Sequence, residues 1–269
     1  MAQAPAFIAA TFFVSWALWL IAAILTPPEL SVGVRSLFFL PGTVTPALVA
    51  VWFASRSKST AAELLQRVVR WQVAVRWYVF AVLYIVVAKL TAAVVYRLAA
   101  GDWPEFSDAP FYLLLLATVA STPVQVGEEL GWRGYLLPRL ASAAGWPVAS
   151  LVVGVVWASW HLPLFFLPGT DSTGHPFIPF VLAVTAVSVA MTWLYFKTGG
   201  SLLPVMLMHA AINNLTGLVP SRAVAGNPFA LRATPLAWVT TAILWAGALY
   251  FLFDLSPAAT AGRQTARRA

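Results

Sequence analysis

Cysteine is absent from the 269 residues, and aspartate and glutamate together number only 9. The lack of cysteine excludes disulfides, thiolate nucleophiles and cysteine-ligated metal, but it does not identify a redox compartment. Charged residues make up 9% of the chain, whereas soluble domains carry about 25%. Because hydrophobic residues make up 61%, the composition predicts a polytopic membrane protein.

A basic segment is also missing from the amino terminus, where Met-Ala-Gln-Ala-Pro precedes an apolar run from Phe7 to Leu25. This run is long enough to span a bilayer, so we expect a retained transmembrane helix rather than a cleaved signal peptide. The formal charge of +7 lies in loops and the tail instead of one patch. Membrane topology accounts for that distribution, and no nucleic-acid partner is expected.

Eight stretches approach the roughly 20 apolar residues that a spanning helix needs. They are 6–25, 36–55, 77–99, 111–138, 147–167, 177–196, 201–219 and 234–254. The sequence therefore predicts an all-α, polytopic membrane helix bundle with its polar site in the core. One integral domain is expected, with three parts. They are N-terminal spans and an interfacial helix (1–109), a core that carries the polar motifs (110–220), and a last span with a basic tail (221–269).

Loop charges predict the orientation of this bundle in the cell membrane. The 56–76 connection is rich in arginine, whereas the 101–110 connection holds three acidic residues and no Lys or Arg. The positive-inside rule places 56–76 and both termini in the cytoplasm, although Arg222 and Arg232 oppose the pattern. The stretch 59–72 is interpreted either as an amphipathic interfacial helix or as a plain linker helix.

The stretch 111–138 is too long for one span and would place its glutamates near the cytoplasmic exit. Ser121-Thr122-Pro123 is typical of a helix start, with a hydroxyl cap before proline. We therefore expect a break near Pro123, followed by a helical segment to about Leu140. The glutamates would then lie at depth, facing a cavity that tolerates irregular backbone.

Glu128 and Glu129 are adjacent, and Arg133 follows four residues after Glu129. Glu129 and Arg133 share a helix face and are expected to form an ion pair. Glu128 points about 100° away and is expected to be free to take a proton. The alternative is a helix end whose charges lie among the headgroups. Lys89, in the middle of the third span, is expected to pair with one of the glutamates or to snorkel.

Two further polar clusters occupy later spans. Trp157 lies one turn before His161 and is expected to stack on or shield the imidazole. His209 and Asn213 share one face of the seventh span, and Asn214 ranks second because it is turned away. Such a His/Asn pair can stabilise an oxyanion, ligate a metal through the histidine, or join two helices.

Three runs carry a resemblance to a known family. They are Glu-Glu-Leu-Gly-Trp-Arg-Gly-Tyr-Leu-Leu-Pro (128–138), Trp-His-Leu-Pro (160–163) and Met-His-Ala-Ala-Ile-Asn (208–213). In this order they resemble the CAAX protease and bacteriocin-processing family. These intramembrane endopeptidases are also called abortive-infection or type II CAAX prenyl endopeptidase-like proteins. The similarity covers roughly residues 110–220.

The resemblance implies a membrane-embedded endopeptidase that acts on a peptide or lipidated peptide in the bilayer. By that resemblance Glu128 activates water with help from His161, and His209 and Asn213 form the oxyanion site.

Supporting roles are also implied by the resemblance. Glu129 and Arg133 would support the catalytic residues. Trp157 stands where the family often has phenylalanine, a departure expected to reshape the cavity wall. Metal-free water activation is favoured over zinc, whose ligands would be Glu128, His161 and His209.

Two other function classes compete with the endopeptidase. One is a non-catalytic immunity or scaffold protein that keeps the bundle without the chemistry. The other is a transporter in which buried Lys, Glu and His relay protons. No inverted repeat is visible in the sequence, which disfavours the transporter.

Overall fold

The computed structural model describes residues 3–27, 29–56, 58–168, 170, 172–221 and 227–256. These residues form helices joined by turns and loops, and no strand occurs among them. Arg222, which opposes the predicted charge pattern, and the basic tail lie outside the described residues. The expectation of an all-α fold is confirmed.

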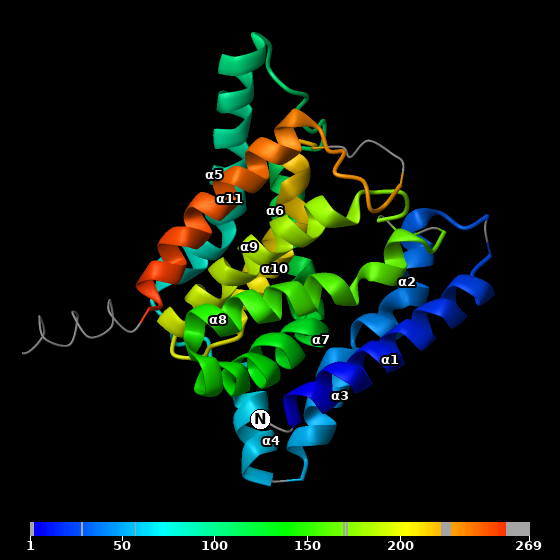
Figure 1. The fold of residues 1–269 in the computed structure, drawn as a ribbon, viewed down its shortest axis with the longest axis vertical. Helices are drawn as coiled ribbons and strands as arrows, with labels where there is room; N and C mark the ends of the chain where they lie inside the picture. Colours follow the sequence, from blue (N-terminus) through cyan, green and yellow to red (C-terminus); the bar gives the residue numbers. More distant parts are fainter. Residues whose placement is uncertain are drawn as a thin grey trace, which may run out of the picture.

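The helices form an inner group flanked by two outer groups (Figure 1). One outer group contains α1 (Gln3–Leu25), α2 (Val32–Thr43) and α3 (Thr45–Ala54), and the other contains α5 (Val75–Ala100) and α11 (Pro235–Asp254). The inner group contains α6 (Phe111–Ser121), α7 (Val126–Glu129), α8 (Leu137–Trp160), α9 (Phe177–Lys197) and α10 (Leu203–Leu215). Helix α4 (Lys58–Gln66) lies at one end of the bundle, where α1 also begins.

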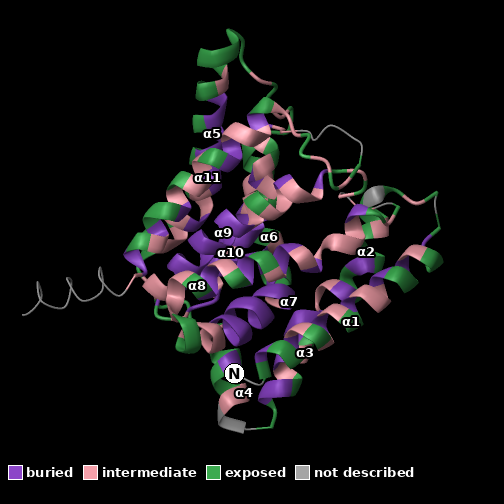
Figure 2. Ribbon diagram, in the orientation of Figure 1, coloured by how far each residue is buried: buried purple, intermediate pink, exposed green. Residues whose placement is uncertain are grey.

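Apolar side chains cover the outside of this bundle as well as its core. Helices α7, α9 and α10 are largely buried, whereas α1, α5 and α11 present exposed faces (Figure 2). Phe13, Leu98 and Phe253 on those outer helices are 77%, 81% and 68% exposed. Extensive exposed apolar surface is unfavourable in water and suits a lipid environment. The fold is therefore that of a multi-pass membrane protein.

Six helical stretches in the described chain are long and apolar enough to cross a membrane, fewer than the eight predicted. The predicted fourth and fifth spans lie in one 50-residue stretch, Phe111–Trp160. Gly145 divides this stretch with a kink at φ 79° and ψ 162°. The predicted seventh span is α10, whose 13 residues rise only about 20 Å at 1.5 Å per residue. That is shorter than the hydrocarbon core of about 30 Å.

The irregularity expected near Pro123 is present, as a tighter turn of helix. Helix α6 ends at Ser121 and a 3₁₀ turn, Thr122–Gln125, leads into α7. The expected hydroxyl cap is wrong, because the Ser121 side chain donates to the carbonyl of Thr118 instead. The π-helix Leu130–Leu136 that follows was not predicted. Such wide turns are frequent at functional sites.

A close helix contact places α3 directly against this irregular segment. A Cβ atom on Gly131 would lie 2.6 Å from the carbonyl oxygen of Pro46, too close for any side chain. Gly127, one turn earlier, lies similarly against Val44, where the corresponding closest distance is 2.9 Å. The two glycines therefore let the backbone that carries both glutamates approach α3.

Candidate active site

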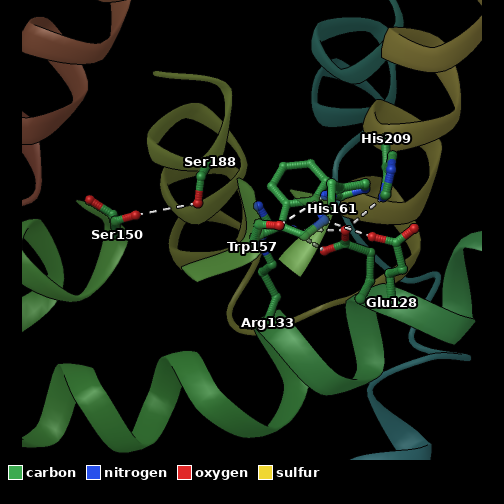
Figure 3. A network of polar contacts seen from close by, with 8 residues as sticks. Glu128, Arg133, Ser150, Trp157, His161, Ser188 and His209 are labelled. Atoms are coloured by element: carbon green, nitrogen blue, oxygen red, sulfur yellow. Dashed lines mark hydrogen bonds and ion pairs between the residues drawn. The ribbon is translucent and has the colours of Figure 1, made fainter. Parts of the chain in front are cut away.

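The three sequence motifs converge in the interior of the bundle (Figure 3). Helix α7 supplies both glutamates, the π-helix supplies Arg133, and α10 supplies His209. Helix α8 supplies Trp157 and ends immediately before His161. Residues separated by about 80 positions in the sequence are thus in direct contact.

The carboxylate of Glu129 binds two basic side chains. Its Oε1 accepts from Arg133 Nη1 at 2.8 Å and from His209 Nδ1 at 2.7 Å. The expected pair of Glu129 with Arg133 is therefore present, and both side chains are fully buried. Arg133 Nε and Nη2 are also buried but have no hydrogen-bond partner among the described residues. Buried charges must be paired, so Glu129 is committed to neutralising its neighbours.

Glu128 occupies a different environment, although it is adjacent in sequence and also buried. Its Oε2 accepts a hydrogen bond from the indole Nε1 of Trp157 at 2.6 Å. Within the described part of the chain, no Lys, Arg or His nitrogen lies at ion-pair distance from Glu128. A neutral donor orients this carboxylate without cancelling its charge. Glu128 therefore remains able to accept a proton.

Trp157 contacts four side chains of the cluster, which are Glu128, Arg133, His161 and His209. Besides its bond to Glu128, its ring lies 4.3 Å from the guanidinium carbon of Arg133, within cation–π distance. Its ring centroid lies 5.1 Å from that of His209 and 6.0 Å from that of His161. The sequence predicted the contact with His161 but missed the bond to Glu128. Helical spacing cannot reveal a contact between two helices.

Hydrogen bonds define which histidine nitrogen carries a proton. His161 Nδ1 lies 2.9 Å from the carbonyl oxygen of Trp157, and a carbonyl can only accept. His161 therefore carries Nδ1–H, and in the neutral ring Nε2 keeps its lone pair. His209 Nδ1 likewise donates to the Glu129 carboxylate. Its Nε2 can donate only when the ring is doubly protonated.

The two asparagines of α10 have different surroundings, and the ranking of Asn213 above Asn214 at the site stays a prediction. Asn213 is exposed, and its side chain makes no hydrogen bond to the described residues. Asn214 Nδ2 donates to Ser121 Oγ at 3.0 Å and to the carbonyl of Ala210 at 2.8 Å. Asn214 therefore ties α10 to the end of α6, and Asn213 lies one turn beyond His209 without an internal partner.

Lys89 does not pair with either glutamate. Its Nζ donates to Ser221 Oγ at 2.5 Å, and the residue is only 1% exposed. The expectation of an acidic partner is therefore wrong, and the side chain does not snorkel to the surface either. A serine hydroxyl in the segment after α10 satisfies the ammonium group instead, away from the cluster of glutamates.

The candidate zinc ligands are not arranged as a metal site. Across the described residues, no three His, Asp or Glu side chains are grouped closely enough to hold an ion. Glu128 and His161 each use one polar atom in bonding Trp157, and His209 uses Nδ1 in bonding Glu129. Those bonds leave Nε2 of each histidine unused, as in histidines that ligate zinc through Nε2. What disfavours a zinc centre with three protein ligands is therefore only that the described residues are not grouped as one. We derive no catalytic step through a metal.

Two comparisons with known proteins match the region that forms this cluster. The family described as type II CAAX prenyl endopeptidase Rce1-like matches residues 108–215, which carry all three motifs. A curated CAAX prenyl protease 2 of Methanococcus maripaludis is 24% identical over 224 residues, covering 76% of this chain and 80% of the relative. These similarities confirm the resemblance seen in the sequence and support a membrane endopeptidase.

Proposed function

We propose that this chain, which belongs to the type II CAAX prenyl endopeptidase-like family, hydrolyses a peptide bond with water activated by Glu128. The difference between two adjacent buried carboxylates carries the proposal. Glu129 bonds the guanidinium of Arg133 and the imidazole of His209, whereas among the described residues Glu128 accepts a hydrogen bond only from an indole N–H. A general base must be oriented yet free to take a proton, and Glu128 is the carboxylate that meets both conditions.

In the proposed reaction, Glu128 removes a proton from a water molecule as the water oxygen attacks the scissile carbonyl carbon. His161 accepts a hydrogen bond from the second O–H of that water at Nε2, the nitrogen that its bond to Trp157 leaves with a lone pair. That hydrogen stays on the attacking oxygen. The C–N bond of the tetrahedral intermediate then breaks, and Glu128 returns its proton to the leaving amine. Both groups orient the water, and Glu128 alone carries the proton from the water to the amine.

The carbonyl oxygen becomes negative during the attack and needs N–H donors. His209 can supply Nε2–H in its doubly protonated form, while its Nδ1–H remains bonded to the Glu129 carboxylate. Asn213 lies one turn along the same face of α10. Its side-chain amide can donate to the oxyanion because it bonds no other residue in the described chain. Donors placed in advance at the developing charge are a major source of catalysis.

The proposal extends to location and substrate. The substrate is a peptide or lipidated peptide that reaches the site from the bilayer, and the reaction needs no metal. The protein is placed in the cell membrane with both termini in the cytoplasm. The arginine-rich connection that contains α4 supports this orientation, because the N-terminal end of α1 lies at the same end of the bundle.

Cleavage of a peptide library by the purified protein tests the proposal. Glu128→Gln keeps the shape of the side chain and an oxygen for the Trp157 indole, but removes the base. We expect it to lower kcat by about 100-fold or more, the usual contribution of a general base, and His161→Ala to lower it as well. Matching Tm values for the variants would show that folding is intact.

Two outcomes would count against the proposal. Cleavage by Glu128→Gln at the wild-type rate would remove Glu128 from the mechanism. A folded wild-type protein that cleaves no member of the library would favour the non-catalytic scaffold.

A further inference from the structure

A cavity of about 580 Å³ lies outside the catalytic cluster, where α4, α8 and the turn between α9 and α10 meet. Its polar lining includes Arg67 and Arg70, and its apolar lining includes Trp146, Tyr195 and Phe196. The volume lies within the range of small-molecule sites. Pro138, at the end of the first motif, is the one cavity-lining residue that belongs to a motif. The proposed peptidase assigns no role to the arginines or aromatic residues of this cavity.

Both arginines are held in place by the surrounding protein. Arg67 Nη1 donates to the Tyr195 hydroxyl at 2.7 Å and to the carbonyl of Gly134 at 3.1 Å. Arg70 Nη1 donates to the carbonyl of Gly199 at 2.6 Å. The carbonyl of Arg70 in turn accepts from Ser201 Oγ. The guanidinium groups therefore need little further ordering to bind a ligand.

These arginines retain unused donors. In the described chain each guanidinium bonds through Nη1 alone, so its other N–H groups are available to a ligand. A smaller adjoining cavity of about 60 Å³ shares Arg67 and adds Arg139, and Glu63 lines both. Three arginines thus oppose one glutamate, and the site has an excess of positive charge.

We propose that this cavity binds the phosphate headgroup of an anionic phospholipid. A guanidinium fork matches phosphate geometrically, and basic cavities between helices at the cytoplasmic face suit anionic headgroups. The wall formed by Trp146, Tyr195 and Phe196 suits the glycerol and upper acyl region, where aromatic side chains accumulate. Tyr195 and Phe196 lie in the last turn of membrane-spanning α9, so the cavity sits where a headgroup would lie.

The bound lipid would also be linked to the catalytic segment through Arg67. Arg67 joins the cavity to the carbonyl of Gly134, which lies in the π-helix beside Arg133. Because Arg67 serves both the cavity and this helix, its replacement would disturb the fold. Arg70, which is exposed and bonds only the α9–α10 turn, is the better residue for testing binding.

Lipid retention by the intact protein in detergent, measured by native mass spectrometry, tests the proposal without using activity. The lipids are phosphatidylglycerol and phosphatidylcholine, and inorganic phosphate is the soluble competitor. We expect phosphatidylglycerol to bind more tightly than phosphatidylcholine, and Arg70→Gln to weaken its binding roughly fivefold. Glu63→Gln should strengthen it, because one opposing charge is removed.

The matched control is Arg76→Gln, an exposed arginine close in sequence that lies over the Trp77 ring and does not line the cavity. Equal loss of binding in Arg76→Gln and Arg70→Gln would indicate general surface charge and overturn the proposal. Displacement of the lipid by millimolar inorganic phosphate would assign the site to free phosphate instead. Unchanged lipid binding in Arg70→Gln, with weaker binding of a peptide substrate, would assign the cavity to the peptide.

Discussion

Replacing Trp157 with phenylalanine separates the hydrogen bond to the base from the packing around it. Phenylalanine keeps an aromatic ring against Arg133 and His209 but removes the N–H that lies 2.6 Å from Glu128 Oε2. The carbonyl that receives His161 Nδ1 belongs to the backbone and is retained. The substitution therefore acts on the orientation of Glu128 while leaving the rest of the cluster in place.

The expected magnitude follows from the type of bond that is lost. A hydrogen bond to a charged group contributes about 1.5–3 kcal/mol. If the reacting geometry requires that bond, kcat falls by about 10- to 150-fold, because about 1.4 kcal/mol corresponds to tenfold in rate. KM should change little, since the proposed oxyanion donors on α10 are retained.

Steady-state cleavage by Trp157→Phe and Trp132→Phe tests this reasoning. Trp132 is fully buried, but its indole N–H has no hydrogen-bond partner in the described chain, so its replacement removes packing alone. A second comparison places Trp157→Phe in a Glu128→Gln background, where it should have no further effect on kcat. Equal losses in both backgrounds, or kcat within twofold of wild type in Trp157→Phe, would refute the role of the indole.

Three other predictions concern stability and cofactor dependence. Glu129→Gln leaves Arg133 buried without its counter-ion and should lower the free energy of unfolding by about 3–5 kcal/mol. Adding Arg133→Met should restore the unfolding midpoint but not peptidase activity. A midpoint that stays low in the double variant would contradict this. Gly131→Ala should destabilise by about 1–3 kcal/mol because its Cβ meets Pro46 backbone, whereas Gly33→Ala, with no atom within 4 Å, should not; equal midpoints would contradict the close packing. A strong chelator should leave cleavage unchanged, and inhibition that zinc reverses would contradict the metal-free mechanism.

The membrane class and the cluster members could be predicted from sequence because each depends on local information. Apolar runs predict helices in lipid, and a spacing of four residues predicted the bond between Glu129 and Arg133. The irregular segment near Pro123 was also visible, since proline and hydroxyl residues have local backbone preferences. What was missed depends on contacts between helices, such as the bond from Trp157 to Glu128.

Span counting failed for a related physical reason. Composition predicts that a segment prefers lipid, but its helical length depends on where the backbone bends. Gly145 adopts positive φ inside a long apolar stretch, and α10 ends at Leu215 although apolar residues continue to Val219. The partner of Lys89 was missed because Ser221 is one of many hydroxyls and has no distinguishing spacing.

The proposed reaction keeps the net charge of the buried cluster constant. The proposed reaction starts from a form in which Glu128 and Glu129 carry negative charge, and Arg133 and a doubly protonated His209 carry positive charge. When water attacks, Glu128 becomes neutral and the negative charge moves to the substrate oxygen beside His209. A low-dielectric interior penalises any uncompensated charge, so moving one charge within a balanced group avoids that penalty. Glu129 therefore has a supporting role in the proposed reaction, in which it holds Arg133 and His209 in place without touching the substrate.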